Sequence, residues 1–257
     1  MSSIHETAIV HPNAKLGEDC EIGPYCIIGE HVCLGARNKL HSHVVIDGHT
    51  QIGDDNEIFP FASLGLKTQD LKWDGGVTWT RIGNSNTIRE YVTIHSATSD
   101  GEATIVGSNN NFLAYSHLAH NVVVGDHVIM SNVATLAGHV IVEDHAIIGG
   151  LAAIHQFCRI GRNCMIGGCS KVVQDALPFM ITDGNPSKTR FVNQEGLKRK
   201  GISKDAQSAL KQCYKWLCRD HLTTTKALEK MDEEFPELPE VQHLARFIRE
   251  SERGIAT

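Results

Sequence analysis

Aromatic side chains are scarce in this chain of 257 residues, at 6% of the total, whereas glycine is abundant at 23 residues. A conventional core built on Phe, Tyr and Trp is therefore not expected. No apolar run approaches the roughly 18 residues that a membrane-spanning helix needs, and the N-terminus lacks the basic start and apolar stretch of a secretion signal. These absences predict a cytoplasmic protein with no stable membrane insertion.

An excess of basic charge is also lacking, because 24 Lys and Arg stand against 30 Asp and Glu, a net charge of −6. Nucleic acid is therefore not an expected partner. The eight cysteines form no CxxC pair, and in a long chain without a signal peptide we expect them to be reduced. The motifs GxSxG, GxGxxG and HExxH and the phosphate-binding P-loop are absent, so a direct transfer without a covalent intermediate is the simplest chemistry.

A period of six residues is the strongest pattern that is present. Steps of six from Ile4 to Val172 meet an apolar residue everywhere except at Asp70, Gly76 and Asp100. Four residues after the apolar position the side chain is mostly small or β-branched, and four of the eight cysteines fall there. One residue after it glycine recurs, as a turn with positive φ would favour. Two inward-pointing residues in six predict a parallel β-helix with three short strands in each coil of about 18 residues.

Two domains follow from where this repeat ends. Residues 1–189 are predicted to form the hexapeptide-repeat β-helix, with loops near 66–81 and 97–105 that leave its phase unchanged. Residues 190–257 are predicted to form a C-terminal α-helical domain. Its helices are expected over SKDAQSALKQCYKWLCRDH, which Ser203 would cap, and over TTTKALEKMDEEF and PEVQHLARFIRESERG. The predicted class is mainly β with a helical cap.

Charge is divided unevenly between these domains. Residues 190–257 carry 13 basic and 11 acidic side chains, net +2, which leaves 11 basic and 19 acidic, net −8, for the first 189. Between residues 196 and 219 only Asp205 is acidic. The basic side chains of this segment predict either a solvated helix face or a docking surface for an acidic partner: Arg199, Lys200, Lys204, Lys211, Lys215 and Arg219.

Histidines gather between residues 117 and 155, and the coil length places some of them in one column. Adding 18 to His120 gives Gly138, and adding 18 again gives Gln156. Because Gly138 has no side chain, a notch should open beside His120 and expose a backbone N–H next to an imidazole. A base next to an oxyanion donor suits direct transfer. A cluster of structural histidines and a zinc site on three of them, His117, His120 and His139, are the alternatives.

Five segments on the prism and beyond it identify a resemblance: LAGHV (136–140), AIHQFC (153–158), QDLK (69–72), SHLAH (116–120) and EGLKRKG (195–201). Together with the hexapeptide repeats, they make the chain similar to the UDP-N-acetylglucosamine 3-O-acyltransferases, which begin lipid A synthesis. The related N-acyltransferases carry an extra domain before the prism, whereas the repeats here begin at Ile4, which favours the O-acyltransferases.

The resemblance implies a left-handed prism, a homotrimer with active sites at its subunit clefts, and no metal or cofactor. It implies that His120 is the general base that acts on the sugar 3-hydroxyl and that the Gly138 amide holds the oxyanion. The implied substrates are UDP-N-acetylglucosamine and a 3-hydroxyacyl chain on acyl carrier protein, which is acidic and would dock on the basic helical face. The positions implied to bind substrate are Asp70, Lys72, His117, Asn121, His139, His155, Gln156, Gly168, Asn193, Glu195 and Arg199.

Two residues depart from the family pattern, and one glycine has two interpretations. Asn121 stands where Asp is common, and an amide accepts a hydrogen bond from imidazole but cannot stabilise its charge. Lys200 stands where a second Arg is common. Lysine keeps the positive charge but lacks the forked guanidinium of arginine. Gly168 matches the far end of the acyl groove, where glycine implies a long chain, or it is a simple turn glycine.

Three rival functions therefore stay open. One is a zinc-dependent hydratase of the carbonic anhydrase type, built on the same kind of prism. Another is a trimeric binding scaffold without catalytic activity. Asn121 also leaves room for an acceptor with a 3-amino group in place of the 3-hydroxyl.

Overall fold

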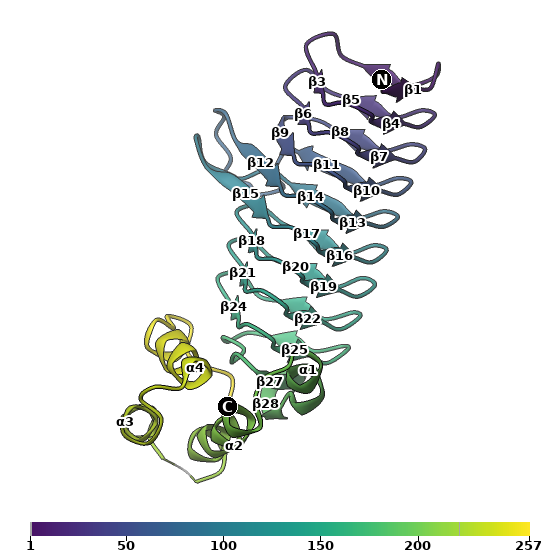
Figure 1. Ribbon diagram of the computed structural model, residues 1–257. Helices are drawn as coiled ribbons and strands as arrows, with labels where there is room; N and C mark the ends of the chain where they lie inside the picture. Colours follow the sequence, from purple (N-terminus) through teal and green to yellow (C-terminus); the bar gives the residue numbers. More distant parts are fainter. Residues whose placement is uncertain (1, 221) are drawn as a thin grey trace.

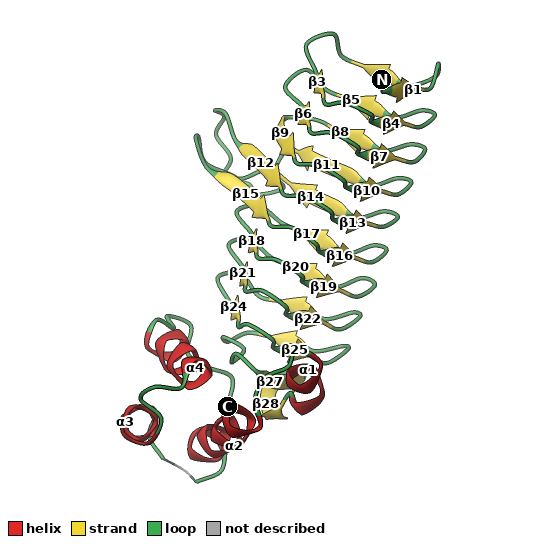
Figure 2. Cartoon of the chain, viewed as in Figure 1, coloured by secondary structure: helices red, strands yellow, loops and turns green. Residues whose placement is uncertain are grey.

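A computed structural model describes residues 2–220 and 222–257, so Met1 of the first predicted domain and His221, at the end of the first predicted helix, lie outside the described residues. Most of the chain winds into a long three-sided prism, and helices cover one end of it (Figure 1). Strands and tight turns alternate along the whole prism (Figure 2).

Each side of the prism is one sheet. The first, with 11 strands, contains β1 (Ser3–Ile4), β4 (Glu21–Ile22), β7 (Lys39–Leu40), β10 (Glu57–Ile58), β13 (Thr87–Ile88), β16 (Asn111–Phe112), β19 (Ile129–Met130), β22 (Ile147–Ile148), β25 (Met165–Ile166), β27 (Met180–Gly184) and β28 (Ser187–Val192). The second, with nine, contains β2 (Ile9–Val10), β5 (Ile27–Ile28), β8 (Val45–Ile46), β11 (Ser63–Leu66), β14 (Thr93–His95), β17 (His117–Leu118), β20 (Thr135–Leu136), β23 (Ala153–Ile154) and β26 (Lys171–Val172). The third, with eight, contains β3 (Lys15–Leu16), β6 (Cys33–Leu34), β9 (His49–Ile52), β12 (Trp79–Ile82), β15 (Ala103–Val106), β18 (Val123–Val124), β21 (Ile141–Val142) and β24 (Arg159–Ile160).

Apart from β27 and β28, strands in one sheet come from successive coils and run parallel. Ser3 pairs with Glu21, a step of 18 residues, as the repeat predicts. The step widens to 30 residues from Glu57 to Thr87 and to 24 from Thr87 to Asn111. The additional residues leave the prism as two segments, 67–78 and 96–102, and the phase is then restored.

Both segments are shorter than the loops expected near 66–81 and 97–105. Leu66 still belongs to β11, and β12 and β15 begin at Trp79 and Ala103. The expected loops were too long because their last residues pair in the third sheet, where Trp79 lies opposite Ala103.

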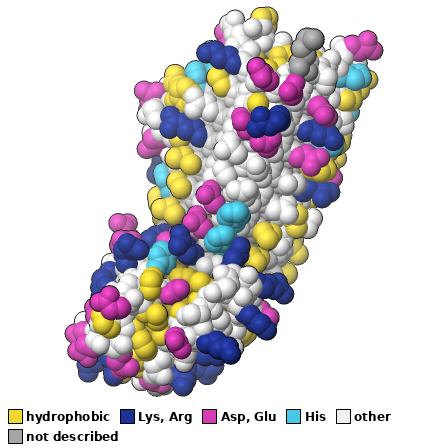
Figure 3. Space-filling model, in the orientation of Figure 1, with side chains coloured by type: hydrophobic (Ala, Val, Ile, Leu, Met, Phe, Trp, Pro, Cys, Tyr) yellow, Lys and Arg dark blue, Asp and Glu magenta, His cyan; other side chains and the backbone are white. Residues whose placement is uncertain are grey.

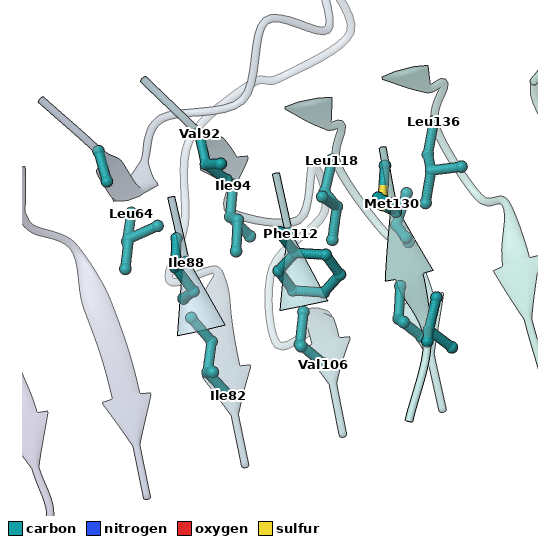
Figure 4. Close-up of a cluster of buried hydrophobic side chains, with 14 of the residues drawn as sticks. Leu64, Ile82, Ile88, Val92, Ile94, Val106, Phe112, Leu118, Met130 and Leu136 are labelled. Atoms are coloured by element: carbon teal, nitrogen blue, oxygen red, sulfur yellow. The ribbon is translucent and has the colours of Figure 1, made fainter. Parts of the chain in front are cut away.

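In the middle of the prism, apolar side chains from successive strands, mostly Ile, Leu and Val, gather in its interior (Figure 4). Leu118, Leu136 and Ile154 are at most 2% exposed, and the residues of the small column between strands are buried with them. The four cysteines of that column lie in this core as predicted: Cys20, Cys26, Cys158 and Cys164.

The recurring glycines have a different cause from the one expected. Among the twelve that follow an apolar position, only Gly65 has positive φ. A Cβ on Gly17 would lie 2.4 Å from the carbonyl carbon of Gly35 in the next coil, so close approach between coils excludes a side chain. The positive φ falls two residues later, as at Asn121 and His139.

The C-terminal part begins with a hairpin and continues as helices. Strands β27 and β28 pair antiparallel and extend the first sheet to Val192, past the boundary expected at residue 189. Helices α2, α3 and α4 match the three that were predicted, and the Ser203 side chain caps α2 by accepting from Ala206 N–H. The short helix α1 was not predicted. The helices are α1 (Gln194–Arg199), α2 (Lys204–Cys218), α3 (Thr224–Glu234) and α4 (Pro239–Arg249).

Candidate active site

His120 lies at the corner of the prism that follows β17. Leu118, two residues before it, is fully buried in the core. The backbone on both sides of His120 is bonded to the next coil, because Ala119 N–H donates to Leu136 (3.0 Å) and His139 N–H donates to the His120 carbonyl (3.1 Å). The ladder therefore fixes this corner, and 15% of the His120 side chain is exposed.

Gly138 occupies the same corner one coil further on. A Cβ on Gly138 would lie 2.4 Å from both Cε1 and Nε2 of His120, so the imidazole itself fills the notch that we expected to be open. The Gly138 carbonyl accepts from Phe157 N–H (3.2 Å), whereas its own N–H donates to no group in the described part of the chain. A free backbone donor therefore belongs to the residue against which the imidazole packs.

Asn121 determines which nitrogen of His120 carries the proton. Its Oδ1 lies 3.0 Å from His120 Nδ1 and also accepts from Thr98 N–H (3.1 Å). An amide oxygen only accepts, so Nδ1 must be the donor in this pair and Nε2 of the neutral ring has a free lone pair. Asn121 thus orients His120, as an amide acceptor can.

Asp70 reaches the other side of the imidazole from the segment between β11 and β12. Its Oδ2 lies 3.7 Å from His120 Nε2, and 22% of its side chain is exposed. The Lys72 N–H donates to Asp70 Oδ1 (3.0 Å), and this hydrogen bond lowers the pKa of Asp70 below its usual value. A carboxylate therefore faces the nitrogen that is free to accept a proton, and the exposed Lys72 lies two residues away.

Two more of the predicted histidines, His139 and His117, lie near the His120 corner. The rings of His139 and His120 meet edge to face at 5.2 Å, and burial lowers the pKa of His139. His117 packs edge-on against His95 at 5.1 Å and lies within hydrogen-bond distance of Thr93 Oγ1 (2.7 Å). Burial, reinforced by the nearby His95, lowers the pKa of His117 to about 4. Both imidazoles are therefore neutral near pH 7.

His155 and Gln156 are exposed at the same corner, one coil beyond Gly138. The guanidinium of Arg253 lies 3.3 Å from Nδ1 of His155 and ties this corner to the C-terminal end of the chain. The edge from His120 through Gly138 to Gln156 thus carries a base, a free donor and polar side chains in one line.

A zinc site on the three histidines is not supported by this arrangement. Within residues 2–220 and 222–257, no group of three or more His, Cys, Asp or Glu side chains is placed to hold a metal ion. His117 instead engages Thr93 and His95.

Comparison with known proteins agrees with the motifs. The family model described as "Udp N-acetylglucosamine O-acyltransferase; Domain 2" matches residues 175–256, and "Bacterial transferase hexapeptide (six repeats)" matches residues 1–36. An acyl-(acyl-carrier-protein) UDP-N-acetylglucosamine O-acyltransferase from Thermodesulfovibrio yellowstonii is 50% identical over 99% of both chains. The enzyme of that name from Saccharophagus degradans is 48% identical over the same share. The chain belongs to the UDP-N-acetylglucosamine O-acyltransferase family.

Solved structures of the family have the same architecture. LpxA from Acinetobacter baumannii is 45% identical and covers 99% of both chains with a TM-score of 0.95. LpxA from Bacteroides fragilis is 38% identical, with a TM-score of 0.96 over 99% of this chain and all of that one. The family and the mainly β fold, a parallel β-helix with C-terminal helices, are therefore confirmed.

Not every position that the family resemblance implied lies near His120. Asn193 caps α1 by accepting from Gly196 N–H (3.1 Å), and its Nδ2 donates to the Asn163 carbonyl (3.0 Å), so its amide is engaged at both ends. Glu195 and Arg199 are exposed on α1, which lies beside β25 and β27 in Figure 1. Among the described residues, none of these three contacts the His120 corner.

Gly168 lies at a different corner, the one that follows the 11-stranded sheet. Its φ is not positive, and a Cβ there would meet only the Gly150 carbonyl oxygen, at 3.3 Å. Backbone strain does not require a glycine at this position, but a Cβ 3.3 Å from a backbone oxygen would be a tight contact, so the open acyl groove and the simple turn glycine both stay predictions.

Sequence reasoning missed several polar residues of the site: His95, Thr98, Glu102 and Thr104. The amide nitrogen of Asn121 donates to Glu102 (2.6 Å), and its backbone N–H donates to Thr104 Oγ1 (2.9 Å). The 24-residue step that pairs Thr93 with His117 contained the signal, because it places the segment 96–102 beside residue 121.

The membrane and docking expectations concern the remaining surface. No helix in the described chain is long and apolar enough to cross a bilayer.

The six basic residues proposed for docking are all exposed on α1, α2 and the residues that cap them. Figure 3 shows Lys and Arg side chains gathered at this end of the molecule.

Proposed function

We propose that this chain transfers a 3-hydroxyacyl group from acyl carrier protein to the 3-hydroxyl of UDP-N-acetylglucosamine, with His120 as general base and no covalent intermediate. One observation carries the assignment of the base. Nδ1 of His120 faces the Asn121 oxygen, which leaves Nε2 free, and the same ring packs against Gly138, whose N–H is unbonded in the described structure.

The proposed reaction uses one imidazole twice. Nε2 accepts the proton of the sugar hydroxyl while its oxygen attacks the thioester carbonyl carbon. The Gly138 N–H donates to the oxyanion that forms, and such a donor contributes about 3 kcal/mol to transition-state stabilisation. The tetrahedral intermediate then collapses, the C–S bond breaks, and the imidazolium returns its proton to the thiolate of the carrier. Asp70, 3.7 Å from Nε2, stabilises the imidazolium while it exists.

The polar edge binds the sugar nucleotide in this proposal. Lys72 meets the diphosphate, while neutral His117 and His139 offer hydrogen bonds to the sugar without adding charge. His155 and Gln156 shape the cleft beyond Gly138.

A homotrimer accounts for the residues that lie away from His120. In a cyclic trimer one corner of each prism faces a different corner of its neighbour, so Asn193, Glu195, Arg199 and Gly168 serve the site of an adjacent copy. The corner that follows the 11-stranded sheet supports this assignment. Tyr25, Tyr115 and Leu151 project from it with more than half of their surface exposed, and a neighbouring copy would cover them.

Acyl carrier protein docks on the basic face of α1 and α2. Lys204, Lys211 and Lys215 lie at helical spacing along α2, opposite the buried Cys213. In the described chain no acidic side chain pairs with these three lysines. A free basic face of this kind attracts an acidic protein at a rate that depends on salt. We place the reaction in the cytoplasm, where unpaired cysteines stay reduced.

One assay tests the function. The purified protein is given carrier-protein thioesters of several 3-hydroxyacyl lengths, with either the 3-hydroxyl or the 3-amino form of the nucleotide sugar as acceptor. We expect an ester at the sugar 3-position and, because Gly168 leaves the groove open, a preference for chains of about 14 carbons. Asn121 is the observation that favours the 3-amino acceptor, and an amide as the sole product would establish that activity instead. No product with either acceptor would contradict the proposal and favour a binding scaffold.

A further inference from the structure

The side-chain amide of Asn121 has two chemically different ends, and the structure fixes both. Thr98 N–H can only donate, so it requires the amide oxygen, which it meets at 3.1 Å. The Glu102 carboxylate accepts, so it requires the amide nitrogen, which donates to its Oε2 at 2.6 Å. The oxygen is left to face Nδ1 of His120 at 3.0 Å. The three groups Glu102, Asn121 and His120 therefore form a continuous hydrogen-bonded line.

Glu102 occupies its place because of the insertion that widens one coil. It is the last residue of the segment 96–102 and directly precedes β15. Its N–H donates to the Ser99 carbonyl (3.1 Å), and its carbonyl accepts from Trp79 N–H (2.9 Å). The backbone of Glu102 is thus held on both sides, and its side chain extends to Asn121.

Within the described residues, the carboxylate that is linked to the Nδ1 side of His120, through Asn121, belongs to Glu102. Asp70 lies on the Nε2 side, where the sugar hydroxyl must enter, and Thr98 and Thr104 are uncharged. The charged and titratable groups that surround the ring are Glu102, Asp70, Lys72, His95 and His139. A carboxylate that accepts from an amide polarises it and makes its oxygen a stronger acceptor.

We propose that Glu102 is a positioning residue that completes a relay from Glu102 through Asn121 to His120. The carboxylate locks the amide with its oxygen toward Nδ1, which keeps Nε2 free to accept a proton. It also supplies, one residue further away, the negative charge that an Asp after the base supplies directly. The proton on Nδ1 stays in place throughout, so no proton reaches Glu102. The relay rests on the proposed role of His120 as the base.

The first test replaces Glu102 by Gln in the full-length protein and measures transfer against pH. The change keeps size and removes charge. We expect kcat to fall about tenfold, with KM for the nucleotide sugar within about twofold, because the imidazolium is formed only during the reaction. The acidic limb of kcat/KM should move about half a unit to lower pH, because the protonated ring is less stabilised. Asp100→Asn, in the same segment, removes a carboxylate that bonds Val77 N–H, and it should leave the limb in place.

The second test exchanges the carboxylate of Glu102 and the amide of Asn121 between the two positions. Asn121→Asp alone places two carboxylates 2.6 Å apart in the wild-type geometry and should lower kcat. In the double variant Glu102→Gln with Asn121→Asp, the Gln amide donates to the new carboxylate, which now contacts the imidazole. We expect the double variant to exceed both single variants in kcat, with its acidic limb at higher pH than in wild type. A structural role for Glu102 alone would restore the rate without moving the limb, and that result would overturn the relay.

A measurement without substrate separates the relay from the proposed function. The His120 ring is titrated by NMR in the free protein, and it should titrate at lower pH in Glu102→Gln than in wild type. If the wild type forms no acylated sugar but this shift is seen, the relay stands and the proposed reaction falls. If the titration, the acidic limb and kcat are all unchanged in Glu102→Gln, the relay is wrong.

Discussion

The prism and the helical end build their cores in opposite ways. The prism core is one cluster of mostly aliphatic side chains, from Ala and Val to Ile and Leu, in which Phe112 is the only aromatic among the described residues. The helical end packs around large ones, including Phe179, Trp216 and Phe247. The narrow interior of a coil is filled by aliphatic residues without aromatic bulk, whereas amphipathic helices use larger side chains to fill the space between them. Regular geometry in the prism thus places reactive groups, while the helices offer a surface.

The two regions meet through charged side chains as well as through the apolar cluster in which Phe179 and Met180, at the end of the first sheet, pack with residues of α2 and α4. Glu143 on the prism and His243 on α4 lie 2.8 Å apart. Burial acts to raise the pKa of Glu143, but its bonds to His243 and to the Arg162 N–H outweigh burial and lower it. Arg159 extends from the prism over the ring of Phe247, 4.4 Å from its centroid. In the proposed function the prism carries the chemistry and the helices carry recognition, a contrast that the following variants test.

The largest effect is expected at the prism corner. His120→Ala should lower kcat by about 10²-fold to 10⁴-fold, as is typical when a general base is lost, because among the described residues no other imidazole packs against Gly138. Steady-state kinetics measure this loss, and size-exclusion chromatography checks that the assembly is intact. Activity within about tenfold of wild type in an intact assembly would end the assignment of the base.

A specificity change is expected at a second corner of the prism. Gly168→Met should move the preferred donor to shorter acyl chains, since the new side chain fills the groove and a buried methylene contributes about 1 kcal/mol. Gly168→Ala is the graded control and should move the preference less, because its Cβ meets only the Gly150 oxygen. Competition between donors of different length gives the ratio of kcat/KM. An unchanged ranking in the Met variant would remove Gly168 from the acyl groove.

A smaller effect, on KM rather than kcat, is expected at the helical end. Reversing Lys211 and Lys215 to Glu should raise KM for the carrier-bound donor about tenfold at low salt and by less at high salt. Reversing the exposed Lys188 and Lys226 changes net charge equally and is the control. If both pairs raise KM alike, overall charge rather than a docking face is responsible.

The smallest effect concerns stability in acid. The pKa of His117 is about 4 in the folded chain, against about 6.5 for an unfolded histidine. Between these values only the unfolded state binds the proton, so the free energy of unfolding falls as pH drops through this window. His117→Asn should therefore lose about 2 kcal/mol less stability than wild type between pH 7 and pH 5. Thermal melts at both pH values measure this difference, with the exposed His5→Asn as control, and equal losses in all three proteins would show that His117 does not titrate as described.

The same contrast explains how far the sequence alone could predict the molecule. The six-residue repeat predicts the prism, its inward residues and the column that joins His120 to Gly138, because the step between coils is constant. The repeat does not show which of its six positions has positive φ, because every position recurs with the same period. Positive φ was therefore expected at the glycine position, whereas it falls two residues later. Helices α2 to α4 follow from caps and apolar spacing, while α1 is too short to show a period.

The rest of the site depends on distances that no repeat encodes. Glu102 and Thr98 contact Asn121 from the inserted segment 96–102. In the sequence, only the wider spacing of that coil indicates where this segment rejoins the prism. The family resemblance supplied Asn193, Glu195 and Arg199, and one chain does not bring them to His120. Stacking arithmetic cannot find them, because it relates positions only within a single prism.

The protonation state of His120 in the free protein tests the central claim most directly. Nitrogen-15 NMR of histidine-labelled protein, assigned with His120→Gln, distinguishes the two neutral tautomers above the titration range of the ring. The account predicts a proton on Nδ1 and a bare Nε2, since the Asn121 oxygen accepts at 3.0 Å. A proton on Nε2 would contradict it, because that nitrogen could not then take the proton of a sugar hydroxyl.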